Sequence, residues 1–202
     1  MSLRKDLKII SEFIEEKEKI LDVGCGDGDL IDFLSKKLVD CRGIELSQEG
    51  VNKCVEKGLT VIQGDANSDL QDYPNNVFTT VILSQTIHAM SSPEDVIMNL
   101  IRIGKRAIIS FPNFAYWKIR LDLLFRGRMP KNDILPHEWY NTPNIHLCSI
   151  SDFEHFCKQK KLKIIKKVLI SEQGYKINSS FSENLMAYQG VYCISKRKKF
   201  SV

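Results

Sequence analysis

The sequence predicts an α/β fold, with a doubly wound and mostly parallel sheet of seven strands whose last strand is reversed. Two observations predict this fold class. Short continuous apolar segments alternate with segments whose apolar residues recur at helical spacing, as expected for parallel strands covered by helices on both faces. A glycine-rich turn directly follows the first apolar segment, and in doubly wound folds this turn is where a ligand binds.

The first predicted elements surround this turn. An amphipathic helix opens the chain, with apolar residues at helical spacing at Leu3, Leu7, Ile10 and Ile14. A short buried strand over 19–23 leads into the glycines. The helix after them has apolar positions at Leu30, Ile31, Leu34 and Leu38.

Three further strands and their helices follow in alternation. The second and third strands are predicted over 41–46 and 59–65, and Ser47 is placed to cap the helix between them. The fourth strand covers 78–85, and the sequence Ser92-Pro93-Glu94 begins the next helix. The fifth strand, 106–113, is ended by a proline.

The last third of the chain contains a helix over 151–161, a strand over 163–170 and a final strand over 187–195. Residues 114–150 depart from the alternation, so we interpret them as an insertion after the fifth strand. Such insertions usually cover the ligand crevice at the carboxyl ends of the strands. We expect one domain over 1–202, with this insertion as a lid.

Composition supports an ordinary globular protein. A chain of 202 residues has a net charge of +4, and part of that charge lies in one terminal run, Lys196 to Lys199, which we interpret as a solvated tail. This distribution argues against nucleic-acid binding. The six cysteines form no CxxC pair, so a reduced, cytoplasmic protein is expected. The absence of an apolar run of about 20 residues argues against a membrane span.

The glycine turn and the acid before it suggest a ligand with two charges. Gly24, Gly26 and Gly28 would let backbone N–H groups and a helix N-terminus meet an anion. A dinucleotide site requires G-x-G-x-x-G, but the spacing here is G-x-G-x-G, with Asp29 in the place of the third glycine. Asp22 suits an ammonium group. An α-amino acid end has both charges.

Two more acids stand at the next strand ends. Glu45 is positioned to accept both hydroxyls of a ribose, and Asp65 to accept the exocyclic amine of adenine, with Ala66 packing on the ring. Amino acid, ribose and adenine are the parts of S-adenosylmethionine. The structural alternative is that the glycines only reverse the chain and each acid only caps a helix.

This series of residues resembles the class I S-adenosylmethionine-dependent methyltransferases, which have a Rossmann-like fold. The resemblance implies that Leu46 packs on the adenine and that Ser84, at the end of the fourth strand, lines the sulfonium. The cofactor would be S-adenosylmethionine or S-adenosylhomocysteine. A nicotinamide-dependent oxidoreductase is a more distant alternative, opposed by the missing third glycine.

Several longer stretches resemble the methionine biosynthesis protein MetW family: LDVGCGDGDL, IQGDAN, VILSQTIHAM, SFPNFAYW, LLFRGRMP and WYNTPNIHLCSISDFE. They include the insertion. Proteins of that family are associated with homoserine O-acyltransferases, so the resemblance implies a protein that supports such an enzyme in methionine biosynthesis. The alternative is an active methyltransferase on a small molecule or, less readily, on RNA or protein. The sequence leaves open whether methyl transfer occurs, and no catalytic residue is assigned.

Three other features have competing interpretations. The resemblance would place Gln where His88 stands, and this histidine is either a general base or a hydrogen-bonded wall residue. Trp117, Leu121, Leu124 and Phe125 share one helical face, which either packs on the domain as a lid helix or docks on a partner. No metal is expected, because HEWYN at 137–141 lacks the second histidine of a zinc motif.

Overall fold

The computed structural model describes residues 3–37, 39–177 and 182–197, so predictions on Leu38, Lys198 and Lys199 lie outside the described residues. Its strands form one sheet in the order β3-β2-β1-β4-β5-β8-β6-β7. The strands are β1 (Lys19–Val23), β2 (Asp40–Glu45), β3 (Val61–Gln63), β4 (Phe78–Ser84), β5 (Gly104–Pro112), β6 (Leu162–Ile170), β7 (Lys176–Ile177) and β8 (Gln189–Lys196).

The predicted fold class is confirmed, with one difference in strand count. The first five strands run parallel, and β8 pairs antiparallel with both β5 and β6, so the last strand is reversed as predicted. The sheet has eight strands among the described residues, not seven. The additional one, β7, is a two-residue edge strand, which is too short to have a recognisable sequence pattern.

Five helices lie where the alternation predicted them, and these are α1 (Lys5–Ser11), α2 (Asp29–Ser35), α3 (Gln48–Glu56), α4 (Pro93–Ile103) and α6 (Ile150–Gln159). Helix α5 (Trp117–Arg126) belongs to the insertion, and the four-residue helix α7 (Glu183–Met186) was not predicted. Short 3-10 helices cover Asp69–Asp72 and Ile87–Ala89. Ser47 caps α3 by accepting a hydrogen bond from Gly50 N, as expected from its position. None of the helices described combines the length and the apolar character that a bilayer crossing requires.

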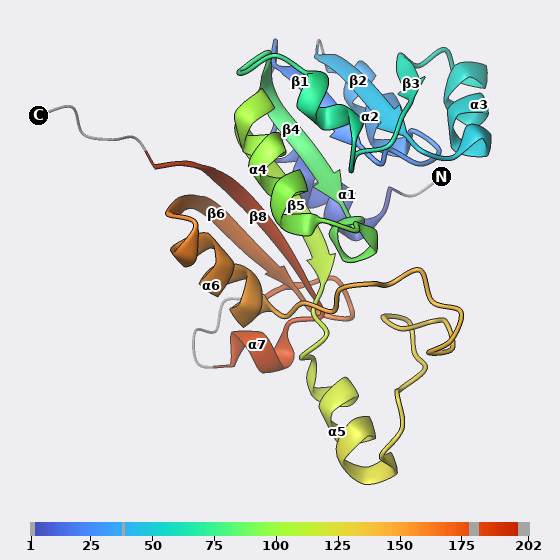
Figure 1. The fold of residues 1–202 in the computed structure, drawn as a ribbon, viewed down its shortest axis with the longest axis vertical. Helices are drawn as coiled ribbons and strands as arrows, with labels where there is room; N and C mark the ends of the chain where they lie inside the picture. Colours follow the sequence, from blue (N-terminus) through green and yellow to red (C-terminus); the bar gives the residue numbers. More distant parts are fainter. Residues whose placement is uncertain (1–2, 38, 178–181, 198–202) are drawn as a thin grey trace, which may run out of the picture.

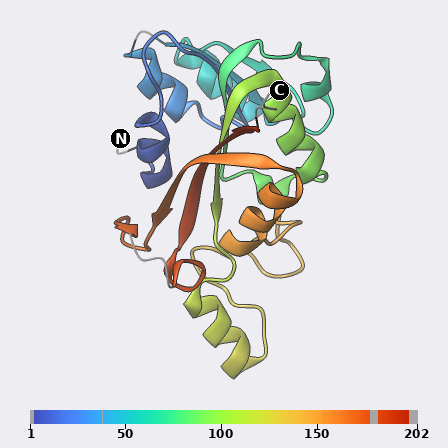
Figure 2. The same cartoon turned by 90° about the vertical axis from the view of Figure 1, so that its left-hand side faces the viewer.

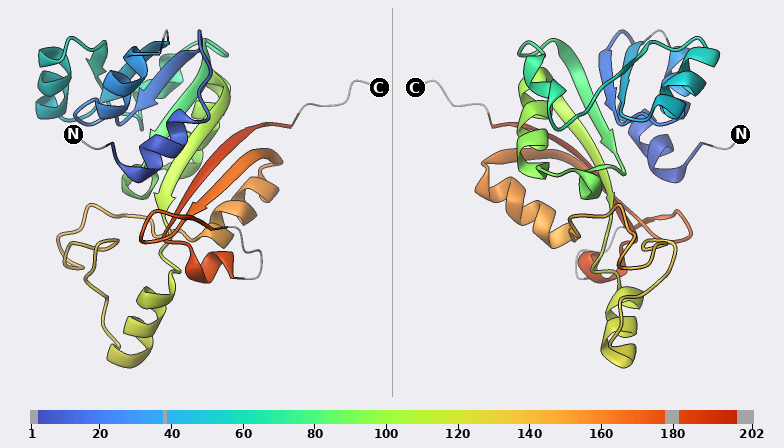
Figure 3. Two further views of the ribbon diagram at one scale, coloured as in Figure 1. Left: turned by 180° about the vertical axis from the view of Figure 1, so that it is seen from behind. Right: turned by 45° about the vertical axis from the view of Figure 1, so that its right-hand side comes forward.

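Helices cover both faces of the sheet. Figure 1 shows α4 and α6 in front of the strands, and the view from behind shows α1 on the opposite face (Figure 3). Two clusters of buried side chains correspond to these layers. Ile20 and Ile82 pack with α1 and α2, whereas their chain neighbours Leu21 and Val81 pack with α4 and α6. This alternation follows from the two-residue period of a strand.

The insertion begins at the carboxyl end of β5 and contains α5. This helix projects away from the end of the sheet (Figure 2). Only Ile119 of its residues is buried, while Leu124 and Phe125 are 73% and 79% exposed. The expectation that a lid helix buries its apolar stripe on the domain is therefore wrong for these two residues. Periodicity shows that such a stripe exists but not what covers it.

Candidate functional site

A cavity of about 230 Å³ lies at the carboxyl ends of β1 and β4. It brings together four of the nine predicted ligand-binding residues, which are Asp22, Gly24, Gly26 and Ser84. The remaining side chains that line it include Arg4 and Leu7 from the N-terminal segment and Asp27, Asp29 and Leu30 from the turn and the start of α2. The carboxyl edge of a doubly wound sheet is where ligands bind in such folds.

The three glycines of the turn share a left-handed backbone conformation. Gly24, Gly26 and Gly28 all have positive φ angles, of 68°, 57° and 77°. A Cβ on Gly28 would lie 2.5 Å from Leu59 Cδ1, so this glycine is also required by close packing against the protein. Apart from its two chain neighbours, none of the described residues has a heavy atom within 4 Å of the place where a Cβ on Gly26 would stand. The space above Gly26 is therefore open to a ligand.

The backbone amides of this turn are mostly engaged inside the protein. Gly24 N donates to Ile44 O at 2.8 Å, and Gly28 N donates to Cys25 O at 3.0 Å. Gly26 N donates to Glu45 Oε2 at 2.7 Å. The expectation that free N–H groups of the three glycines bind an anion is therefore wrong, because each already has a partner. An anionic group in this cavity needs another donor.

Arg4 supplies a cation at the same cavity. Its guanidinium pairs with the buried Asp6 (Nε to Oδ1, 2.8 Å) and also donates to Ser84 Oγ. Asp6 in turn accepts hydrogen bonds from Ser84 Oγ at 3.1 Å and Ser110 Oγ at 2.8 Å. Arg4 keeps about half of its side chain exposed. Sequence reasoning missed Arg4, because only the fold brings the segment before α1 to the ends of β4 and β5.

Asp22 is the buried acid of the site. Its residue is only 3% exposed, and its Oδ1 has no hydrogen-bond partner among the described residues. Burial raises the pKa of Asp22 to about 7; the nearby Arg4 opposes this shift and the carboxylates of Glu45 and Asp6 add to it. A carboxylate that lacks a partner in a polar cavity is suited to a ligand that brings a positive charge.

Glu45 and Leu46 lie beside the turn. Glu45 Oε2 accepts from Gly26 N, and its Oε1 accepts from Ser47 N at 2.9 Å. Each carboxylate oxygen keeps a second lone pair, which a hydroxyl can use. Leu46 is 65% exposed and offers an apolar surface next to that carboxylate in the chain. Neither side chain lines the 230 Å³ cavity.

Asp65 and Ala66 follow β3, the strand beyond β2. Asp65 Oδ1 accepts from both the backbone N and the side-chain Nδ2 of Asn67 at 2.9 Å, so the side chain also stabilises its own turn. Ala66 is buried. These residues lie outside the lining of the cavity at Asp22, at the next strand ends of the same sheet edge.

His88 does not line the cavity at Asp22. It lies in the 3-10 helix after β4 and lines a separate cavity with Gln85. Burial lowers the pKa of His88. Its ring packs edge-on against Phe114, with 6.1 Å between the ring centroids.

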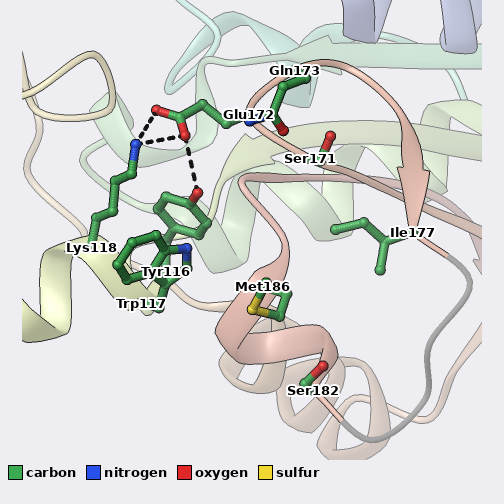
Figure 4. A pocket seen from close by; sticks show the side chains of 9 residues that line it. All are labelled: Tyr116, Trp117, Lys118, Ser171, Glu172, Gln173, Ile177, Ser182 and Met186. Carbon is green, nitrogen blue, oxygen red and sulfur yellow. Dashed lines mark hydrogen bonds and ion pairs between the residues drawn. The ribbon is translucent and has the colours of Figure 1, made fainter.

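A cavity of larger volume lies elsewhere. It has a volume of about 510 Å³ and is bounded by the start of α5, the segment after β6 and the region of α7. Figure 4 shows an ion pair in its wall, in which Lys118 Nζ lies 2.7 Å from Glu172 Oε2, and Tyr116 donates to the same carboxylate. It contains none of the predicted ligand-binding residues. Its volume alone does not assign it a ligand.

Comparisons with known proteins agree with the fold and point to a family. The family model described as methionine biosynthesis protein MetW matches residues 4–194. A curated protein of Rhodopirellula baltica, the bifunctional methionine biosynthesis protein MetXA/MetW, is 30% identical over 210 residues, which are 98% of this chain and 34% of that protein. The ubiquinone biosynthesis O-methyltransferase of Methylococcus capsulatus is 32% identical over 92 residues, 43% of this chain and 39% of that protein.

The chain therefore spans only about a third of the first relative and two fifths of the second. Among solved structures, a methyltransferase of Thermotoga maritima described as S-adenosylmethionine-dependent matches with a TM-score of 0.68 at 15% identity. The match covers 96% of this chain and 88% of that one. At this identity, the match supports the fold alone.

Proposed function

The chain belongs to the methionine biosynthesis protein MetW family, and on this premise we propose that it binds S-adenosylmethionine or S-adenosylhomocysteine and supports a homoserine O-acyltransferase. The observation that carries the ligand proposal is the pair of opposite charges at the 230 Å³ cavity. Asp22 has a carboxylate oxygen without a partner among the described residues, and Arg4 lines the same cavity. An α-amino acid end has an ammonium group for the first and a carboxylate for the second.

The nucleoside part of the ligand would lie along the strand ends beyond the cavity. Glu45 holds the turn through Gly26 and retains lone pairs for the ribose hydroxyls. Leu46 offers an apolar face for the adenine, and Asp65 with Ala66 would border the ring at the end of β3. Ser84, at the end of β4, would lie near the sulfonium. This assignment follows the order of the strands in the sheet, β4-β1-β2-β3.

Calorimetric titration with S-adenosylhomocysteine tests the ligand proposal. The wild type should bind, and Asp22→Asn should weaken binding by about tenfold or more, because it removes a charge-assisted hydrogen bond. Asp32→Asn is the matched control, since Asp32 lies in α2 but outside the cavity lining. The proposal fails if the wild type shows no binding heat under conditions in which it remains folded, or if both variants bind equally.

The partner proposal is supported by the MetXA/MetW relative, whose name joins two activities in one chain. A protein partner also needs a surface, and α5 provides one. Leu124 and Phe125 are exposed on this projecting helix, next to Arg126 and Arg128. An apolar and aromatic patch bordered by arginine is typical of protein interfaces. The acyltransferase would therefore contact α5.

Co-purification of this chain with a homoserine O-acyltransferase, together with the change in acyltransferase activity on mixing, tests this part. Phe125→Ser should abolish the association and leave the thermal midpoint unchanged, because Phe125 contributes little buried surface. Val55→Ser, at an exposed position on α3, is the matched control. Association that survives Phe125→Ser would remove α5 from the interface. No association of the wild type would refute the partner.

An active methyltransferase is the second candidate function, favoured by the match to the ubiquinone biosynthesis O-methyltransferase over 92 residues. Incubation with S-adenosylmethionine labelled in the methyl group and with cell extract separates the two. Transfer to a defined small molecule supports the enzyme, and association with the acyltransferase without transfer supports the accessory protein. Either role would be cytoplasmic, in keeping with six cysteines that are all free.

A further inference from the structure

Three buried side-chain atoms lack a hydrogen-bond partner among the described residues, and they divide between two neighbouring cavities. Asp22 Oδ1 belongs to the cavity described above. The other two are Gln85 Nε2 and His88 Nδ1, and both residues line a second cavity of about 240 Å³. Unpaired buried polar atoms are costly, so two of them around one cavity require an explanation.

Gln85, which lines the second cavity, lies in a strained turn at the end of β4. Gln85 directly follows Ser84 and has a φ of 55°, a left-handed conformation that side chains other than glycine rarely adopt. Its backbone N donates to Ser110 O at 2.9 Å and to Ser110 Oγ at 3.2 Å, which fixes this conformation from β5. Strain that neighbouring strands maintain in this way tends to occur at ligand sites.

The insertion forms part of the wall, together with Pro112 of β5 and Gln189 of β8. The insertion residues Asp133, Pro136, Pro143 and Asn144 line the cavity. His88 O accepts hydrogen bonds from Ile145 N at 2.8 Å and His146 N at 3.0 Å, so the backbone of the histidine residue holds the insertion over the cavity. His88 thus has a ring nitrogen without a partner among the described residues, and its carbonyl oxygen accepts the hydrogen bonds that hold the insertion in place.

The walls are unfavourable for an anion. The described residues that line the cavity include no lysine or arginine, and their ionisable side chains are those of Asp133, His88, His137 and Tyr188. Burial lowers the pKa of His88 and raises the pKa of Tyr188, another wall residue, to about 12, so both side chains are uncharged at neutral pH. A buried anion without a cationic partner would be strongly destabilised here.

We propose that this second cavity binds a small uncharged molecule whose carbonyl or hydroxyl group hydrogen-bonds to the side chains of Gln85 and His88. A volume of 240 Å³ accommodates about eight non-hydrogen atoms, if each takes the volume of a water molecule. The amide of Gln85 donates to an acceptor, and a neutral imidazole nitrogen pairs with a donor or an acceptor according to its tautomer. A hydroxyl or carboxamide group satisfies both.

The test compares two molecules of equal size, butyramide and butyrate. Two-dimensional NMR follows the side-chain amide of Gln85 and the ring nitrogens of His88 in labelled protein. Butyramide should shift both sets of signals saturably, with a Kd of about 1–10 mM as expected for so small a molecule. Butyrate should bind about tenfold more weakly or not at all. Equal binding of both, or no shift with either, would overturn the proposal.

Variants locate the site. Gln85→Leu and His88→Leu should each weaken butyramide binding about fivefold or more, because each removes one hydrogen bond. The controls Gln71→Leu and His155→Leu make the same changes at exposed positions outside the cavity and should bind as the wild type does. Unchanged binding in both cavity variants would refute the assignment.

A second readout needs no ligand. In the ligand-free protein, His88→Leu should raise the thermal midpoint by about 2–4 °C, because leucine leaves no buried nitrogen unpaired. His155→Leu should not. A lowered midpoint would mean that the nitrogen has a structural partner, against the proposal. Butyramide binding should also persist in Asp22→Asn, so a failure of the nucleoside site and a failure of this one can be told apart.

Discussion

Arg4 and Asp22 present opposite charges to one cavity although they come from the segment before α1 and from β1. The guanidinium of Arg4 is paired with Asp6, whereas Asp22 Oδ1 has no partner among the described residues. The two charges match the two ends of a zwitterion, which suggests separate tests for each end.

Arg4→Gln should weaken S-adenosylhomocysteine binding by about 10- to 100-fold, because it removes a charge-assisted hydrogen bond to the ligand carboxylate. Affinity for 5′-methylthioadenosine, which lacks the amino acid end, should not change. Calorimetry of both ligands checks this, with Arg42→Gln on the exposed side of β2 as the control variant. Equal losses for the two ligands would show that Arg4 acts on the fold and not on the carboxylate.

Asp22→Asn should stabilise the ligand-free protein at high pH. The folded pKa is about 7 and the ordinary value is 3.8, so between these values the folded state binds more protons than the unfolded chain. The stability of the wild type therefore falls as pH rises from about 4 to 7, and the loss is complete above pH 7. Asparagine does not titrate. The variant should gain up to about 4 kcal/mol at pH 8 and little at pH 4.

Chemical unfolding of both proteins at several pH values measures this difference. A gain that is the same at pH 4 and pH 8 would contradict a raised pKa. The same ionisation predicts that binding of an ammonium ligand releases a proton below pH 7, since the bound form requires the carboxylate. Calorimetry in buffers of different ionisation heat measures that release.

Glu45→Ala should reduce both binding and stability. It removes the acceptor of Gly26 N and Ser47 N, and it removes the proposed partner of the ribose. Affinity for S-adenosylhomocysteine should fall by about 1.5–3 kcal/mol. Glu49→Ala, at an exposed position in the first turn of α3, is the control for calorimetry and thermal unfolding. Loss of stability with unchanged affinity would remove Glu45 from the ribose site.

Arg106→Met should destabilise the protein by about 3–5 kcal/mol, because it leaves the buried carboxylate of Glu18 without its cation. Arg106 Nη2 donates to Glu18 Oε1 and to Phe13 O, both at 2.6 Å. Arg42→Met breaks an exposed pair with Asp40 and should cost about 0–1 kcal/mol. Urea unfolding compares the two. Similar costs would show that solvent screens the Glu18 pair.

The strands and the acids at their ends could be predicted because buried parallel strands have continuous apolar sequences. β1 has its predicted bounds, and β4 ends one residue before the prediction. Once the strands were known, the sheet topology placed Asp22, Glu45 and Asp65 at one edge. β3 is shorter than predicted, at three residues, because two thirds of its side chains are exposed and only backbone pairing defines its length.

The site residues that could not be predicted from the sequence depend on contacts between distant segments. Arg4 reaches Ser84, and Gln85 is held by Ser110, and neither pairing has a local pattern. Strand β5 imposes the conformation of Gln85, and no glycine stands beside Gln85 in the sequence to indicate a turn. The exposure of Phe125 could not be predicted either, because helical periodicity does not reveal whether another element covers the apolar face.

The position of β8 also constrains how the protein is made. This strand comes last among the described elements, yet it lies between β5 and β6. While a ribosome is still synthesising residues 189–196, β6 has no strand through which to join the growing sheet. Until β8 is made, the edge of β5 in the sheet of the first five strands would therefore remain unpaired. A stalled or prematurely released chain would expose that edge to aggregation.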